Sequence, residues 1–443
     1  MAVKVGMVSL GCAKNLVNGE QMLHLLGEAG YEITADLGET EVLIINTCAF
    51  IDSAKQEAID TILEFAELKK EGRLKKLLVT GCLSQRYRAD ILKELPEVDG
   101  LLGTGSYDEI VPAVAAALRG EKPERFGDIS APVSEAERVV TTGPGWAYLK
   151  IAEGCDNRCS YCVIPSIRGR YRSRPMENLL REAEGLAKLG VKELIVVAQD
   201  ITRYGLDLYG EPRLAALIRE LAKIGGLHWI RLHYLYPDLI TEELIDLVAK
   251  EPKVVKYLDI PIQHISDGIL KKMNRRGTGA EIEALLTKLR QRIPGLVLRT
   301  SLITGLPGEG EAEFEELCAF LRRAKLERAG VFAYSPEEGT PAFTMDRPDA
   351  ETASHRSELA VDIQSDIMDE FNASRLGTVQ EVLVEGFDRF ADCWYGRSYA
   401  DSPDVDGKVF FTGSGVKPGE FINVRITDTL EGDLVGVVEE KEE

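Results

Sequence analysis

Three closely spaced cysteines form the most specific chemical pattern in the chain. In the segment EGCDNRCSYCVIP, Cys155, Cys159 and Cys162 follow the pattern C-x-x-x-C-x-x-C. A loop this tight can wrap three thiolates around one face of a four-iron four-sulfur cluster and leave the fourth iron without a protein ligand. An open iron is what S-adenosylmethionine (SAM) requires, because its amino and carboxylate groups chelate the metal while an electron cleaves the sulfonium. Zinc is the alternative, but no fourth Cys or His follows at the usual spacing.

Three further cysteines lie far apart in the sequence but at equivalent places. Cys12, Cys48 and Cys82 each come directly after a short apolar run, in VSLGC, IINTC and LVTGC. Because the carboxyl ends of parallel strands share one edge of a sheet, where ligands bind, we expect these thiolates to meet there. They predict a second cluster with an open iron that can hold exogenous sulfur. Taken singly, each could instead be a small apolar core residue.

Other cysteines and histidines carry weaker signals. Cys318 lies on the apolar face of a predicted helix and Cys393 lies in the C-terminal module, so we interpret both as packing residues. Only His233 and His264 of the five histidines fall near predicted strand ends, and we interpret them as satisfied core or rim residues.

The elements that must position these residues change character along the chain. Residues 1–120 alternate β-type runs with helical stretches, which predicts an open parallel α/β sheet with crossover helices. Residues 121–140 are polar and without a sustained period, which predicts a linker. Residues 141–372 repeat a strand followed by a helix, which predicts a full or partial β/α barrel with its ligands at the carboxyl ends of the strands.

The barrel rule also supplies candidate SAM contacts. Tyr161, inside the cysteine loop, could lie against the adenine or serve as a core aromatic at the barrel mouth. Gln199, Gln263 and Arg299 are expected at or near strand ends. The run GLPGE at 305–309 follows another predicted strand, and its glycines would permit close backbone approach to SAM.

Residues 373–443 form an acidic module of a different kind. Short alternating runs separated by Gly and Asp predict a small antiparallel β-barrel. From residue 375 onward, seven Lys or Arg stand against fifteen Asp or Glu, a net charge of -8 within a chain of net charge -20. This charge argues against a general nucleic-acid binder and favours a basic protein partner. A solubility role for the acidic surface is the alternative.

Composition places the chain among multidomain globular proteins. It has 443 residues, 44% of them hydrophobic and 28% charged. No run approaches the roughly 18 apolar residues of a membrane span, and the start MAVKVGMVSLGC lacks a signal peptide. We therefore expect a cytoplasmic protein with no membrane contact. In that reducing compartment, clustered cysteines indicate metal binding rather than disulfides.

Over essentially its whole length, the chain resembles the methylthiotransferases of the radical SAM superfamily. Their N-terminal methylthiotransferase domain, radical SAM barrel and C-terminal TRAM module match the three predicted units. Within the family it is most similar to the branch that modifies an aspartate of the small-subunit ribosomal protein S-twelve. The segments that carry this choice include SLGCAKNLVNGE, AQDITRYG, RLHYLYP, YLDIPIQH, YSPEEGTPA and DSPDVDG. The tRNA-modifying relatives tend to show GQNVNSYG, and a Ser-Gly pair where this chain reads QHIS.

The resemblance implies a set of cofactors and partners. It implies two 4Fe-4S clusters, SAM as methyl donor and radical source, and sulfide or polysulfide as sulfur source. It implies attack at the β-carbon of the target aspartate to give 3-methylthioaspartate. An external electron donor, a sulfur donor and the basic ribosomal protein are the implied partners, without direct tRNA binding. Two alternatives stay open: a tRNA adenosine methylthiotransferase, and a non-enzymatic iron-sulfur carrier.

Overall fold

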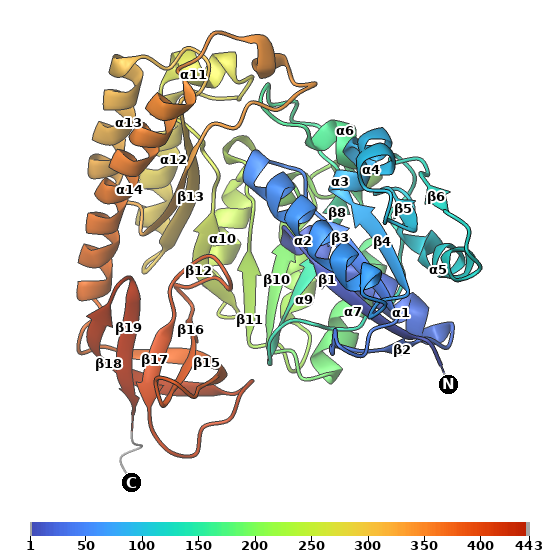
Figure 1. Cartoon of the computed structure of the whole chain (residues 1–443). Helices are drawn as coiled ribbons and strands as arrows, with labels where there is room; N and C mark the ends of the chain where they lie inside the picture. The colour runs from blue at the N-terminus through green and yellow to red at the C-terminus, as the bar shows by residue number, and fades with distance from the viewer. Residues whose placement is uncertain (1, 440–443) are drawn as a thin grey trace.

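The computed structural model describes residues 2–439, which fold into three units (Figure 1). Residue 1 and residues 440–443, at the ends of the predicted first and last units, lie outside the described residues. The first unit is an open sheet of order β2-β1-β3-β4-β5-β6 in which every pair is parallel, as predicted. Its strands are β1 (Lys4–Ser9), β2 (Glu32–Ile33), β3 (Val42–Thr47), β4 (Lys76–Gly81), β5 (Gly100–Leu102) and β6 (Glu124–Arg125). Its helices are α1 (Ala13–Glu28), α2 (Asp52–Lys70), α3 (Cys82–Arg86), α4 (Arg88–Glu94) and α5 (Ile110–Leu118).

The predicted linker at 121–140 begins too early. Strand β6 lies inside this range and pairs with β5, so the sheet continues to Arg125. A two-residue edge strand is too short for any periodicity to reveal it. The rest of the segment is a strap over α1. There Arg138 binds the buried Glu20 at 2.6 Å, and Gln21 donates to the carbonyl oxygen of Ala136.

The second unit is a partial barrel, an open parallel sheet of order β14-β13-β12-β11-β10-β7. Its strands are β7 (Trp146–Lys150), β10 (Glu193–Val197), β11 (Trp229–Leu232), β12 (Val254–Asp259), β13 (Val297–Thr304) and β14 (Arg328–Ala333), with the short pair β8 (Ala152–Glu153) and β9 (Arg172–Ser173) beside them. Its helices are α6 (Ile164–Arg168), α7 (Met176–Lys188), α8 (Leu206–Tyr209), α9 (Leu214–Ala222), α10 (Glu242–Lys250), α11 (Asp267–Lys272), α12 (Gly279–Arg292), α13 (Glu311–Ala324) and α14 (Ala350–Ala373). Apolar runs such as ELIVV in β10 are buried throughout, as expected of parallel strands covered on both faces.

The third unit is a closed five-stranded barrel of order β15-β16-β17-β19-β18. Its strands are β15 (Val379–Asp388), β16 (Cys393–Ser398), β17 (Val409–Thr412), β18 (Phe421–Leu430) and β19 (Asp433–Val438). The predicted small β-barrel is confirmed; four of its five strand pairs are antiparallel, and β17 and β19 pair in parallel. A closed ring with an odd number of strands cannot alternate direction throughout, so one parallel pair is required.

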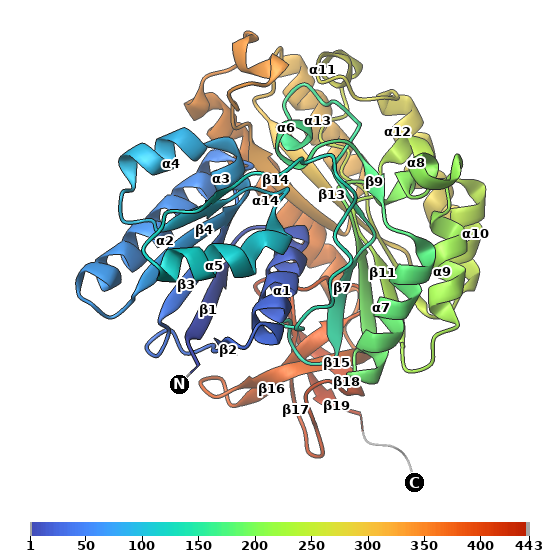
Figure 2. The same cartoon turned by 90° about the vertical axis from the view of Figure 1, so that its right-hand side faces the viewer.

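Helix α1 lies between the N-terminal sheet and the central partial barrel (Figure 2). It therefore buries polar side chains as well as apolar ones, including Lys14, Asn15, Asn18 and Glu20. The acidic barrel lies below both units in Figures 1 and 2. A buried network holds it to the central sheet, in which Glu193 binds Arg231 at 2.6 Å and Arg397 at 2.7 Å.

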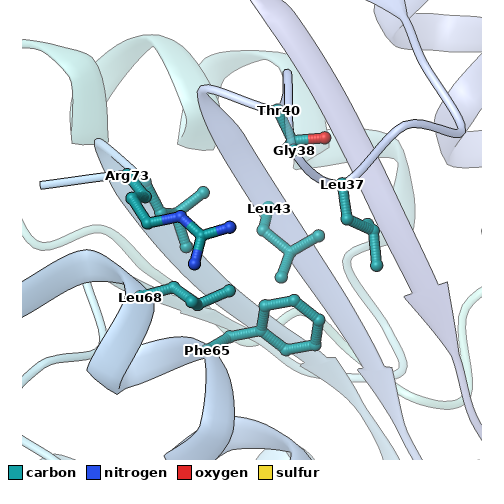
Figure 3. A pocket seen from close by; sticks show the side chains of 8 residues that line it. Leu37, Gly38, Thr40, Leu43, Phe65, Leu68 and Arg73 are labelled. Carbon is teal, nitrogen blue, oxygen red and sulfur yellow. The ribbon is translucent and has the colours of Figure 1, made fainter. Parts of the chain in front are cut away.

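The described residues also contain one very small cavity, away from the cysteines. The small cavity in Figure 3 has a volume of about 10 Å³, and its lining includes Leu43, Phe65 and Leu68. Such a space holds about one water molecule. Within residues 2–439, no helix is long and apolar enough to cross a bilayer.

Candidate functional site

The first cysteine trio lies at one rim of the N-terminal sheet. Strands β1, β3 and β4 are neighbours, and each leads to one cysteine at its carboxyl end. Cys48 directly follows β3, Cys82 is the first residue of α3, and Cys12 immediately precedes α1. Adjacent strands are only about 4.8 Å apart, so parallel pairing alone brings the three side chains together.

Two glycines make this approach possible. A Cβ at Gly11 would lie 2.6 Å from Cβ and 2.9 Å from Sγ of Cys48. The backbone of Gly11, the residue before Cys12, therefore packs directly against the Cys48 side chain. A Cβ at Gly81 would lie 2.5 Å from the carbonyl oxygen of Thr47. Both glycines have positive φ, 87° and 96°. The Gly-Cys pairs at Cys12 and Cys82 are therefore a packing requirement of the rim.

The charges around this trio differ from one thiol to the next. Burial raises the pKa of Cys12, but the positive charges of Lys14 and Arg168 outweigh it and hold the pKa below its ordinary value. Burial raises the pKa of Cys48 to about 12, with Cys12 and Cys82 contributing. Burial also raises the pKa of Cys82. The mutual influence of these three thiols shows that they share one small space.

The second trio lies in the loop between β8 and α6. The backbone N–H of Cys155 donates to the carbonyl oxygen of Gly169 at 3.2 Å, and that of Cys162 donates to the carbonyl oxygen of Cys159 at 3.0 Å. Arg158, at the crest of the loop, has a φ of 51°. Burial raises the pKa of Cys155 to about 11 and that of Cys162 still further above its ordinary value. The loop thus turns three thiols toward a shared interior.

Buried cations lie beside both trios, and neither trio is a compact site for one metal ion. Within the described residues, no three His, Cys, Asp or Glu side chains converge closely enough to hold one metal ion. A 4Fe-4S cluster asks for a looser arrangement, because each thiolate binds a different iron. Buried cations also lie beside each trio, Arg168 next to Cys82 and Arg275 next to Cys159. They would offset the negative charge of a thiolate-bound cluster.

Arg168 connects the helix that follows the second trio to the first trio. It ends α6, six residues after Cys162, yet its guanidinium donates to Sγ of Cys82 at 3.3 Å. The same group donates at 3.0 Å to the side-chain oxygens of Asn15 and Asn18 on α1. Its side chain is 2% exposed. The loop of the second trio is therefore tied directly to the rim of the N-terminal sheet.

Glu153 completes this network on the barrel side. It binds Arg168 at 3.3 Å and Lys150 at 2.9 Å, and it accepts a hydrogen bond from Nε2 of Gln199 at 3.0 Å. Burial opposes the charge of Glu153, but Lys150 and Arg168 dominate and hold its pKa well below the ordinary range. Gln199 lies just past the end of β10, where the sequence predicts it.

A second cation lies at the cysteine loop itself. Arg275 donates to the Tyr161 hydroxyl at 3.2 Å, approaches Sγ of Cys159 at 3.9 Å and lies 4.4 Å from the ring centroid of Tyr236. Tyr161 also packs beside a small apolar cluster that contains Leu306. Its ring therefore lies between the loop and the strand-end segment after β13.

Gln263 and Arg299 occupy different depths of the barrel. Gln263 lies after β12 in the left-handed region, with φ of 71°, and bridges to Leu302 of β13. Arg299 is the third residue of β13, so its predicted position at a carboxyl end is wrong. Its side chain is held instead by Asp259 at 3.0 Å and Asp406 at 3.6 Å. The segment LVLRTSLIT mixes polar and apolar residues and does not show where its first strand residue falls.

The glycines of GLPGE pack closely against neighbouring side chains. A Cβ at Gly305 would lie 2.3 Å from that of Ala353 on α14, and one at Gly308 would lie 1.8 Å from Nζ of Lys272. Glu309 binds Arg356 of α14 at 2.9 Å. The approach of these glycines to SAM stays a prediction, but the side of Gly305 on which a Cβ would stand is filled by Ala353 of α14, and that of Gly308 by the end of Lys272.

His233 and Cys318 behave as predicted, whereas His264 does not: it is buried, but its Nε2 has no hydrogen-bond partner among the described residues. His233 is buried and its Nε2 lies 3.0 Å from Oγ of Ser402, while His264 is buried 3.4 Å from Glu309. Cys318 belongs to the main apolar core of the barrel. Cys393 begins β16 in the C-terminal barrel.

A cavity of about 330 Å³ opens beside Cys12. All three units line it. The N-terminal rim contributes Cys12, the barrel contributes Tyr148, His233, Tyr234, Asp259 and Arg299, and the C-terminal barrel contributes Pro403, Asp404 and Val405. Its volume lies within the range of small-ligand pockets. A side chain that enters it would reach the cysteine rim.

Sequence reasoning missed the cations of this site. Lys14, whose Nζ lies 3.6 Å from the ring centroid of Tyr234, Arg168 and Arg275 all escaped notice. The one available signal was proximity in sequence, since Lys14 follows Cys12 by two residues. No spacing rule connects Arg275 to Cys159, because their contact depends on the folded barrel.

Comparisons with known proteins agree with these three units. The Radical SAM superfamily model matches residues 149–321, the model of Uncharacterized protein family UPF0004 matches 4–103, and the TRAM domain model matches 376–438. The structure of the radical SAM methyltransferase TsrM from Kitasatospora setae, with cobalamin and a 4Fe-4S cluster bound, covers 77% of each chain. It has a TM-score of 0.58 and 16% identity, and so speaks for the fold.

Two similar proteins of known family match the chain from end to end. The ribosomal protein uS12 methylthiotransferase RimO of Pelotomaculum thermopropionicum is 53% identical over 98% of this chain and 99% of its own. That of Geobacter sulfurreducens is 49% identical over 98% of each chain.

Fold and site together define a radical SAM enzyme, a class that uses SAM and a 4Fe-4S cluster. Within that class, the chain belongs to the RimO family of ribosomal protein uS12 methylthiotransferases.

Proposed function

We propose that the chain methylthiolates the β-carbon of an aspartate in ribosomal protein uS12, the small-subunit protein S-twelve, to give 3-methylthioaspartate. The observation that carries this proposal is the contact of Arg168 with Cys82, which ties the helix that follows the Cys155–Cys162 loop to the cysteine rim of the N-terminal sheet. A reaction that joins sulfur to an unactivated carbon needs a radical source and a sulfur source close together. Because the substrate is a ribosomal protein, we expect the reaction to occur in the cytoplasm.

The two trios hold different groups in this proposal. Cys155, Cys159 and Cys162 hold the 4Fe-4S cluster that binds SAM, and Cys12, Cys48 and Cys82 hold a second 4Fe-4S cluster. When bound, these groups and SAM supply one-electron chemistry, a methyl group and a sulfide or polysulfide sulfur. An external electron donor and a sulfur donor complete the requirements.

The chain's own residues orient these groups and balance their charge. Lys14 and Arg168 lie beside Cys12 and Cys82, so their positive charge suits an anionic sulfur species at that rim. Arg275 gives the same support at Cys159. For SAM, we retain Tyr161, Gln199, Gln263 and Arg299 as contacts; Gln199 and Arg299 are held in place by Glu153 and Asp259.

Burial protects the chemistry from water. The cavity beside Cys12 is enclosed by three units, and Tyr148, His233 and Asp259 in its lining are themselves buried. A reactive carbon radical survives only where competing hydrogen donors are excluded. The target aspartate would enter this cavity from the protein substrate.

A tRNA substrate fits this chain less well. The C-terminal barrel, at a net charge of -8 from residue 375 onward, would repel phosphates. The same charge attracts a basic ribosomal protein.

Anaerobic reconstitution with both candidate substrates tests the proposal. Full-length enzyme with SAM, sulfide and dithionite is incubated with uS12 or with tRNA, and each product is analysed by mass spectrometry. A methylthio group on a uS12 aspartate is the expected result. Modification of tRNA adenosine alone would overturn the proposal, and the absence of 5′-deoxyadenosine would favour an iron-sulfur carrier.

A matched pair of cysteine variants tests the role of the first trio, Cys12, Cys48 and Cys82. Cys48→Ala should abolish methylthiolation while sparing SAM cleavage. Cys393→Ser alters a cysteine of the C-terminal barrel and should retain both activities. Normal methylthiolation by Cys48→Ala would contradict the assignment.

A further inference from the structure

The loop at residues 401–407, between β16 and β17, crosses from the C-terminal barrel to the central one. Asp401 binds Arg328 of β14 at 2.7 Å. Asp406 accepts a hydrogen bond from the Tyr257 hydroxyl at 2.6 Å. These two contacts fix both sides of the loop to the wall of the partial barrel.

The tip of this loop lines the cavity beside Cys12. Pro403, Asp404 and Val405 form the contribution of the C-terminal barrel to the lining. Asp404 and Val405 are exposed although their loop is anchored, and Asp404 has a φ of 65°. Burial and the neighbouring Asp404 carboxylate together raise the pKa of Tyr148 on the opposite unit. Asp404 and Tyr148 therefore line the same cavity from different units.

Asp404 is a charge without a partner in a cavity whose other charges are paired. Asp259 and Arg299, also in the lining, bind each other at 3.0 Å. Within residues 2–439, no cation lies within ion-pair distance of the Asp404 carboxylate. An exposed carboxylate held at a rigid position can bind an incoming cation at little cost in conformational entropy.

We propose that Asp404 is a specificity-determining residue that binds a lysine or arginine side chain of the protein substrate beside the aspartate to be modified. This inference rests on the proposed function. The C-terminal barrel thereby does more than dock a basic protein: it places one negative charge in the reaction cavity itself. The same charge would repel a phosphate that approached the cysteine rim.

Asp392 provides a matched control. Like Asp404, it is an exposed aspartate of the C-terminal barrel with positive φ, 52°, but it lies in the turn between β15 and β16 and does not line the cavity. Asparagine is isosteric with aspartate and tolerates the left-handed region. Asp404→Asn and Asp392→Asn thus each remove one negative charge at a residue with positive φ, so the two variants differ in their position relative to the cavity.

The experiment measures methylthiolation of purified uS12 by the full-length, reconstituted enzyme. Asp404→Asn should raise the KM for uS12 by about 3- to 5-fold, the value of one partly screened ion pair, while kcat at saturation is retained. The rise in KM with added salt should be shallower for Asp404→Asn than for the unaltered enzyme. Asp392→Asn should leave the KM and its salt dependence unchanged.

The outcomes separate this inference from the function on which it rests. If the unaltered enzyme does not modify uS12, the proposed function fails. If it modifies uS12 but both variants share its KM and salt slope, only the role of Asp404 is overturned. Equal increases in KM for both variants would also overturn it, because they would assign the effect to the overall charge of the barrel.

Discussion

Replacing Arg168 by glutamine should separate the radical SAM loop from the N-terminal rim. The guanidinium binds Cys82, Asn15, Asn18 and Glu153, and no other described side chain connects all four. Glutamine keeps part of the volume but removes the charge and most of the donors. The perturbation therefore acts on electrostatics and hydrogen bonding more than on packing.

The expected cost can be worked out contact by contact. Removing one partner of a buried ion pair costs roughly 3–5 kcal/mol. Lys150 remains 2.9 Å from Glu153 and keeps that carboxylate paired, so the lower end, about 3 kcal/mol, applies. The amide oxygens of Asn15 and Asn18 lose their donor, which adds about 1 kcal/mol. The free energy of unfolding should fall by about 4 kcal/mol in all.

Urea unfolding of the metal-free protein measures this cost. Arg170→Gln is the control, because Arg170 lies two residues away, is 71% exposed and, among the described residues, pairs at the surface with Asp156 alone. It should leave the free energy of unfolding unchanged. In reconstituted protein, Arg168→Gln should also shift the electron paramagnetic resonance signal of the cluster at Cys12, Cys48 and Cys82, since hydrogen bonds to the thiolates tune that cluster. Equal unfolding midpoints for the two variants would refute the assigned role of Arg168.

Three further predictions concern redox potential, pH and the barrel interface. Arg275→Gln should lower the reduction potential of the cluster at the second trio by tens of millivolts in a redox titration, because a positive charge beside it is lost. The raised pKa values of Cys48, about 12, and Cys155, about 11, keep these thiols protonated at neutral pH. Iron must displace those protons, so iron uptake should increase from about pH 7 to about pH 9, with proton release measurable by calorimetry in two buffers. Glu193→Gln should lower the free energy of unfolding by about 3–5 kcal/mol in urea, because it leaves Arg231 and Arg397 buried without their shared carboxylate.

Each of these has an outcome that contradicts it. Arg276→Gln is the control for Arg275, since Arg276 also lies over the Tyr236 ring, at 5.4 Å, but contacts no cysteine sulfur in the described residues; equal shifts for both would reject a specific effect at Cys159. Iron uptake that is flat or falls over the stated pH range would show that the thiols are already ionised. If the Glu193→Gln variant is as stable as the unaltered protein, Glu193 does not help to hold the C-terminal barrel to the central sheet.

Local sequence patterns predicted most of the fold and the grouping of the cysteines into two trios. Alternating strands and helices predicted both parallel sheets, and the strand-end positions of Cys12, Cys48 and Cys82 predicted one shared rim. The tight spacing of the second trio needed no tertiary information. These features succeed because the chain direction and the strand order of a parallel sheet determine where a strand-end residue lies.

The parts that escaped prediction depend on contacts between units. Arg168 reaches Cys82 across 86 positions of sequence, and Asp404 reaches the cavity from a different barrel. The depth of Arg299 in the barrel required the true start of β13, which the mixed polar and apolar sequence of this segment does not mark. Side chains that act through another unit leave no periodic trace in their own segment.

The iron and labile sulfide content of anaerobically purified protein and of two triple variants tests the central claim most directly. The claim predicts roughly eight iron ions and roughly eight sulfides per chain, each falling to roughly four when either cysteine trio is changed to alanine. An unaltered chain that holds only one cubane, or a trio whose loss leaves the content unchanged, would contradict it.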